Sequence, residues 1–199
     1  VRVDSPIKTG KDLIERLRKD PGSLSIAVAS ALGNHIHTAI AKPLKASGID
    51  LKKLKVVAFK SSGDSMVALL GGHVDVVSSS TPNALTHLRS GKTRVLALSS
   101  AQRLGGDLAQ IPTWPEQGVQ GDFSSWRGLL APKGIGQAQV AYWEGLCARL
   151  NDQEEWKKEL AHQFWFPKYL NSAATTKYWA AQYGEYREIL GAIGLAKEQ

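Results

Sequence analysis

The chain has 199 residues, of which 43% are hydrophobic and 22% are charged, as in an ordinary globular protein. Its formal net charge is +7, from 25 lysines and arginines against 18 aspartates and glutamates. The basic residues are scattered, which argues against a nucleic-acid partner and favours a mild attraction for small anions. No apolar run approaches the length that a bilayer requires, so no membrane span is expected.

Strands and helices are predicted to alternate over the first half of the chain. Thr9 and Asp12 have the spacing of a capping box, which predicts a helix that ends before Pro21 and Gly22. Short apolar runs bounded by turn residues predict strands at residues 24–29, 55–59, 74–78 and 93–99. Helices are expected between them, at residues 34–47, 64–70 and 83–89. This alternation predicts an α/β fold with a mostly parallel sheet flanked by helices.

The pattern changes after Gly105, where helices replace the strand-and-helix units. The expected elements are a short helix near 111–118, extended chain over 123–131, helices at 137–150 and 152–162, a strand near 165–170 and a helix over 172–193. The only cysteine, Cys147, lies in one of these helices and can form no internal disulfide. We therefore place a domain change near Asp122.

Three of the predicted strands end in small hydroxyl or glycine residues that lead into helices. These loops are residues 30–34, 61–63 and 79–81. In an open parallel sheet such loops gather at the carboxyl edge, where ligands normally bind. Each helix start offers backbone N–H donors and a partial charge of roughly +0.5, so the three together would suit a carboxylate or another anion. The alternative is plain helix capping, which the same residue types also perform.

Enzyme and metal motifs are not found in the sequence. His35 and His37 are two residues apart, which places them on different faces of a helix and disfavours a shared metal. His73 and Asp75 have no third candidate ligand at a recognisable spacing. There is no nucleophile elbow, dinucleotide fingerprint or phosphate-binding loop. The sequence therefore predicts no catalytic residue, no metal site and no cofactor.

Four segments, in order along the chain, resemble signatures of the tripartite tricarboxylate transporter receptors, also called Bug or TctC proteins. Residues 69–75 read Leu-Leu-Gly-Gly-His-Val-Asp and are similar to that family's Leu-Gly-Gly-x-Val-Asp stretch. Residues 94–103 resemble its Leu-Arg-Ala-Leu-Ala strand with a later arginine. Residues 111–118 resemble its Pro-Thr, Glu and Gly signature, and residues 126–132 its Trp-x-Gly hinge strand.

The resemblance implies a two-lobed fold like that of type II periplasmic binding proteins, which closes on its ligand. It implies a periplasmic receptor that captures a small carboxylate and delivers it to membrane transporter subunits through transient contacts. The family's ligand-facing positions, together with the loop inferred from the sheet edge, predict a binding site of Ser30, Gly33, Asn34, His35, Ser61, Ser62, Gly63, Ser79, Ser80 and Thr81. Many members have Tyr-Lys-Gly where this chain has Ser61, Ser62 and Gly63, so the side-chain contacts there differ.

The resemblance also implies that one lobe is incomplete in this chain. Family members carry a further N-terminal portion, and Val1 to Pro6 read as a strand end entering a turn inside a longer protein. Residues 5–122 would form the complete second α/β lobe. Residues 123–199 would contain the hinge strand and the C-terminal helices that return to the incomplete first lobe. Uncovered apolar helices in that region would favour a homodimer or exchange between chains.

Two other functions remain open at this stage. Effector domains of bacterial transcription regulators share the two-lobed topology, so a ligand-sensing module is the main alternative. An enzyme of unknown type is the third.

Overall fold

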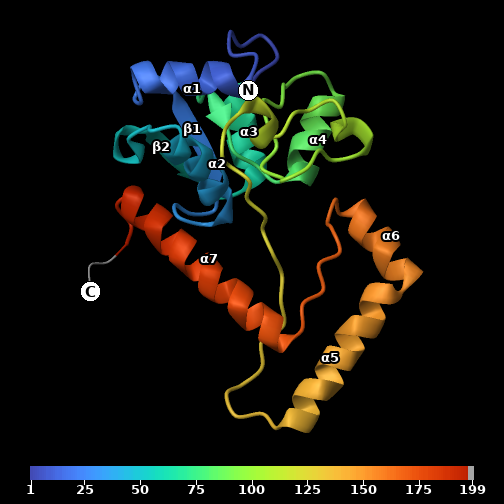
Figure 1. The fold of residues 1–199 in the computed structure, drawn as a ribbon. Coiled ribbons are helices and arrows are strands. Elements are labelled where there is room, and N and C mark those ends of the chain that lie inside the picture. The colour runs from blue at the N-terminus through green and yellow to red at the C-terminus, as the bar shows by residue number, and fades with distance from the viewer. Residues whose placement is uncertain (197–199) are drawn as a thin grey trace. The chain divides into compact units, whose positions relative to one another are not determined.

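The computed structural model describes residues 1–196 and divides the chain into two compact units (Figure 1). The first unit contains residues 1–125 and the C-terminal residues from Tyr186, and the second contains residues 126–185. The division into lobes at residues 5–122 and 123–199 stays a prediction. Among residues 1–196, no helix combines the length and the apolar character needed to cross a bilayer.

The first unit is built on a parallel sheet with the strand order β2-β1-β3. The strands are β1 (Ser25–Ala29), β2 (Lys55–Phe59) and β3 (Val76–Val77). Ala29 lies opposite Phe59 in the register, and Ile26 lies opposite Val76. The prediction of an α/β fold with a parallel sheet is confirmed.

Helices of the first unit alternate with the strands, as the sequence pattern predicts. They are α1 (Gly10–Lys19), α2 (His35–Ala46), α3 (Ser62–Leu70), α4 (Thr81–Arg89) and the short 3-10 turns η1 (Leu51–Lys53), η2 (Gly106–Leu108) and η3 (Pro115–Gln117). The capping box at the start of α1 is present. Thr9 Oγ1 accepts a hydrogen bond from Asp12 N, and Asp12 Oδ2 accepts one from Thr9 N.

The central strand β1 is buried on both faces, and this fixes which helix covers which face. Ile26 and Val28 pack into a cluster with apolar side chains of α1 and α2. Ala27, which points to the opposite face, packs with Met66 and Leu69 of α3. Because successive side chains of a strand alternate between faces, α1 and α2 lie on one side of the sheet and α3 on the other.

The strand predicted at residues 93–99 is wrong. Only single bridges form there, from Thr93 to Arg2 and from Leu98 to Thr113. Between them, Leu96 O accepts a hydrogen bond from the side chain of Gln117 at 3.1 Å instead of from a neighbouring strand. The apolar pattern is that of extended chain, but a ladder also needs a partner strand in register along its length, and the two ends of this segment pair with different segments.

The second unit is helical and has few buried side chains. It contains α5 (Gln137–Asp152), α6 (Glu154–His162) and most of α7 (Ser172–Ala192), whose last turns belong to the first unit. The strand predicted near residues 165–170 is absent, and Arg127 instead stacks over the Trp165 ring at 3.8 Å. Leu160 is the one buried residue of α5 and α6.

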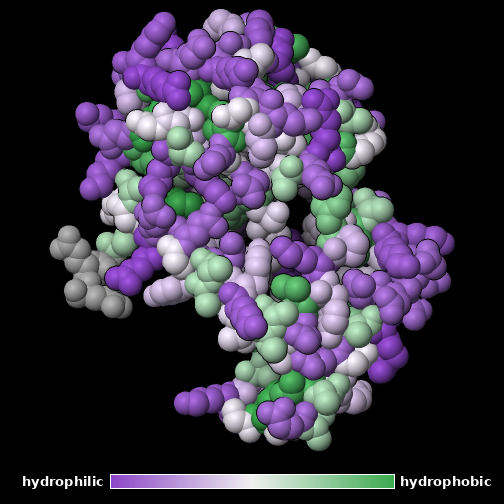
Figure 2. Space-filling model, in the orientation of Figure 1, coloured by the Kyte–Doolittle hydropathy of each residue, from purple (hydrophilic) through white to green (hydrophobic). Residues whose placement is uncertain are grey.

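Apolar side chains of this second unit lie on its surface, as the green areas of Figure 2 show. The exposed ones include Leu129, Leu130, Tyr142, Trp143, Leu150, Phe166 and Tyr183. The expectation that such residues promote a homodimer or exchange stays a prediction.

Candidate functional site

The loops predicted to bind a ligand follow the carboxyl ends of three neighbouring parallel strands. We call residues 30–34, 61–63 and 79–81 the three edge loops. Backbone bonds tie their strand ends together: Ser30 N donates to Phe59 O at 2.8 Å, and Ser78 N donates to Ala27 O at 3.0 Å. The sheet therefore brings all three edge loops to one edge, with the loop after β1 in the middle.

The first edge loop, between β1 and α2, has a tightly bonded backbone. Ser30 and Gly33 have left-handed backbone angles, with φ of +64° and +80°. Asn34 caps α2 by accepting a hydrogen bond from His37 N, and its Nδ2 donates to Ala29 O at 2.7 Å and to Ser30 Oγ at 2.9 Å. A left-handed non-glycine residue costs roughly 1–2 kcal/mol, and these side-chain bonds offset that cost at Ser30. His35 is exposed in the first turn of α2.

In the second edge loop, Ser61 acts as a helix cap. Its Oγ accepts a hydrogen bond from Asp64 N at 3.1 Å and donates to Asp64 Oδ2 at 2.8 Å. Ser62 and Gly63 are the first two residues of α3. The carboxylate of Asp64 in the same turn offsets part of the positive end of the helix. This loop therefore contributes helix-start amides more than a free Ser61 hydroxyl.

The third edge loop contains a hydroxyl with unmet hydrogen-bonding capacity. Ser79 Oγ is buried and has no hydrogen-bond partner within residues 1–196. Ser80, which precedes α4, accepts a hydrogen bond from Asn83 Nδ2 at 2.9 Å, and Thr81 begins the helix. Ser78, which the sequence did not single out, donates its hydroxyl to Ile36 O at 2.8 Å and so ties this loop to α2. Buried polar atoms normally have partners, so the Ser79 hydroxyl is suited to receive one from a ligand or water.

The structure adds His37 to the predicted residues of the first edge loop. Its Nδ1 accepts a hydrogen bond from Gly33 N at 3.0 Å, and the side chain is 4% exposed. Burial lowers the pKa of His37 below its usual 6.5, which keeps the ring neutral and its Nδ1 able to accept. The sequence analysis discusses His37 only as a candidate metal ligand, together with His35. The available signal was its position four residues after a loop glycine, on the first turn of a helix.

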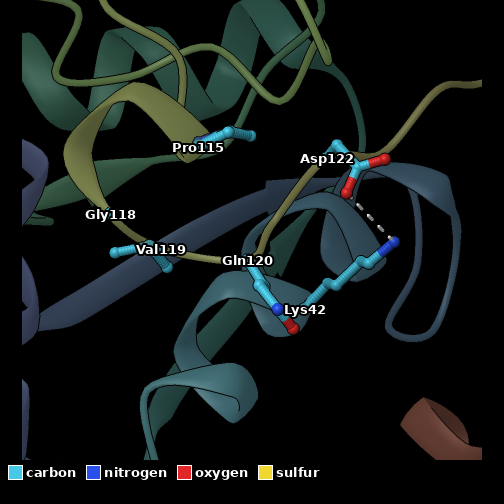
Figure 3. A pocket seen from close by; sticks show the side chains of 6 residues that line it. All are labelled: Lys42, Pro115, Gly118, Val119, Gln120 and Asp122. Atoms are coloured by element: carbon cyan, nitrogen blue, oxygen red, sulfur yellow. Dashed lines mark ion pairs between the residues drawn. The ribbon is translucent and has the colours of Figure 1, made fainter.

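A separate hollow of about 470 Å³ has no edge-loop residue in its lining and is lined in part by Lys42 of α2. It is lined by Lys42, Pro115, Gly118, Val119, Gln120 and Asp122. Figure 3 shows Lys42 and Asp122 reaching toward each other, and they form an ion pair at 3.9 Å. Because the one lysine and the one carboxylate offset each other, the hollow has no excess positive charge to attract an anion. The three edge loops remain the better candidate for an anion site.

No group of three or more histidine, cysteine, aspartate or glutamate side chains that could hold a metal ion occurs within residues 1–196. Gly33, Asn34 and His37 instead interact with each other and with the backbone of the first edge loop.

Residues 1–195 match the model of the tripartite tricarboxylate transporter family receptor, TctC. The chain belongs to this family. The resemblance drawn from the four sequence signatures is thereby confirmed. The TctC family is a family of solute-binding receptors and not of enzymes.

Relatives of known sequence and structure are longer than this TctC chain. A UPF0065 protein of Cupriavidus necator is 29% identical over 199 residues, which span all of this chain and 59% of that protein. The periplasmic binding protein BugD is 26% identical, with a TM-score of 0.74 over 99% of this chain and 65% of its own. A protein of R. palustris solved with adipate has a TM-score of 0.79 and 24% identity, over 98% of this chain and 64% of its own. The fold is that of periplasmic binding proteins, as predicted.

Proposed function

We propose that this chain is the carboxylate-binding part of a periplasmic receptor that delivers its ligand to a tripartite tricarboxylate-type transporter. The observation that carries the proposal is the meeting of three helix N-termini, each preceded by a hydroxyl-bearing loop, at one edge of a parallel sheet. Helix-start amides and the partial positive charge of helix ends stabilise a carboxylate without a buried cation.

The residue types of the proposed site support a ligand that must be released as well as held. None of the ten residues predicted for the site is a lysine or an arginine. A carboxylate bound by amides and hydroxyls exchanges water for protein donors of similar strength, so its net binding energy stays moderate. Ser79 Oγ, which is buried and unpartnered in the described part of the chain, adds a hydroxyl at this edge.

The relatives support the same ligand class and location. The R. palustris neighbour is described with adipate, a dicarboxylate, and BugD is described as periplasmic. We propose that this chain, too, binds a small dicarboxylate in the periplasm. Membership of a receptor family favours transient transporter contacts and disfavours a catalytic role.

Titration of this chain with adipate tests the proposal, with 1,6-hexanediol as the uncharged control of the same length. Adipate at about 100 times its dissociation constant should raise the free energy of unfolding by about 2.7 kcal/mol, and the diol should not change it. A thermal-shift measurement detects this difference. Equal responses to the acid and the diol, or none to either, would contradict a carboxylate site.

A matched pair of variants then places the binding. Ser62→Trp puts a bulky side chain at the start of α3 and should abolish the adipate response. Ser90→Trp changes the serine at the C-terminal end of α4, whose hydroxyl donates to His87 O. This variant should leave the adipate response intact. Unchanged affinity in Ser62→Trp would count against this placement.

A further inference from the structure

The backbone of the first edge loop has two left-handed residues in close succession, and a side chain outside the loop bonds to it. Ser30 has φ of +64° and Gly33 has φ of +80°. Asn34 fixes the Ser30 end, through its Nδ2 bonds to Ala29 O and Ser30 Oγ. The Gly33 end has no such support from within the loop, and its N–H instead donates to His37 Nδ1 at 3.0 Å.

His37 is placed to provide this support because it belongs to the helix and not to the loop. It lies in the first turn of α2, where its own N–H donates to Asn34 Oδ1 at 3.0 Å. Its side chain is 4% exposed, so water cannot readily replace it as the acceptor for Gly33 N–H. Gly33 N–H is therefore committed to the protein and is not one of the amides available to an anion.

We infer that His37 is a positioning residue for the ligand site: its unprotonated Nδ1 holds Gly33 in the left-handed conformation that keeps Ser30 and Asn34 in place at the sheet edge. This role depends on the proposed function in one respect only, namely that the ligand binds at this edge of the sheet. The hydrogen bond and its effect on the loop are properties of the protein without ligand.

The bond itself is tested first in the unaltered chain. An N–H···N hydrogen bond transmits a scalar coupling between the two nitrogens, so NMR should detect one between Gly33 N and His37 Nδ1 near neutral pH. A His37 ring found protonated at Nδ1, or the absence of the coupling when both resonances are assigned, would overturn the inference.

Two variants separate positioning from bulk packing. His37→Asn keeps an oxygen acceptor near the place of Nδ1, whereas His37→Leu keeps the volume and removes the acceptor. The Leu variant should raise the hydrogen-exchange rate of the Gly33 amide by about tenfold or more, and the Asn variant should restore much of the protection. The Ile40 amide in the middle of α2 is the internal control and should be unchanged in both.

The outcomes distinguish this inference from the proposed function. Exchange at Gly33 in the Leu variant equal to that in the unaltered chain would overturn the positioning role, whatever adipate does. If the role holds and adipate binds, adipate affinity should fall by about tenfold in the Leu variant and by less in the Asn variant. Protection at Gly33 without adipate binding would leave the positioning role standing and would count against the carboxylate proposal alone.

Discussion

Gly33→Ala is expected to destabilise the chain by about 2–4 kcal/mol, from two separate causes. The first is conformational, because φ at Gly33 is +80° and an L side chain is strained there. The second is steric, because the added Cβ would lie 2.9 Å from Leu190 Cδ2 and 3.1 Å from Leu195 Cδ1. Chemical denaturation monitored by circular dichroism would measure the loss.

Gly48→Ala provides the matched control for the conformational cause. Gly48 has nearly the same angle, with φ of +77°, but an added Cβ there would meet nothing within 4 Å. Its replacement should lower the free energy of unfolding by only about 1–2 kcal/mol. The difference between the two variants therefore isolates the steric contact with Leu190 and Leu195. Equal losses would mean that Leu190 and Leu195 yield to the new methyl group and that the loop is not tightly packed there.

Leu44→Ala is expected to lower the free energy of unfolding by about 2–5 kcal/mol. The Leu44 side chain is fully buried, in the cluster that joins α1, β1 and α2. Removing it leaves a cavity that the packed neighbours can fill only in part. The loss matters for the site because the same helix carries Asn34 and His37 at its other end.

Val67→Ala is the control for this core substitution. Val67 lies on α3 but is 70% exposed, so its truncation should change stability by less than about 0.5 kcal/mol. Urea denaturation of both variants gives the comparison, with similar slopes expected because the fold is unchanged. A loss below about 1 kcal/mol in Leu44→Ala would show that the core around α2 is looser than the structure indicates.

Local sequence signals were sufficient for most elements of the first unit. Thr9 with Asp12, Asn34 and Ser61 are caps with short side chains whose spacing is recognisable along the chain. The runs that became β1 and β2 are apolar and bounded by turn residues, which is the pattern of a buried parallel strand. Three such strands in parallel order were then enough to place the edge loops together.

Long-range partners explain what the sequence did not reveal. The segment at residues 93–99 has a strand pattern, but its hydrogen bonds go to different segments and to the Gln117 side chain. The bond from Gly33 to His37 depends on burial, which one sequence does not display. The contact of Gly33 with Leu190 joins residues far apart in the chain, and no local pattern predicts it.

In the candidate site too, local sequence identifies the residues, but long-range packing decides their contacts. Its ten residues follow from strand ends and family signatures, and their role in binding stays a proposal. The sequence could not predict which serine hydroxyls are already hydrogen-bonded. Ser61 Oγ is used in capping α3, whereas Ser79 Oγ is buried without a hydrogen-bond partner in residues 1–196. Such differences decide which groups can meet a ligand, and they arise from packing around each loop.

The most direct test of the central claim is an NMR titration of the isotope-labelled chain with adipate, followed at every assigned backbone amide. A carboxylate bound at this edge should cause saturable shifts that are largest in the three edge loops, residues 30–34, 61–63 and 79–81. The shifts around the hollow lined by Lys42 and Asp122 should be small. Saturable shifts confined to that hollow, or unchanged amides in all three edge loops, would contradict a carboxylate site at the carboxyl edge of the sheet.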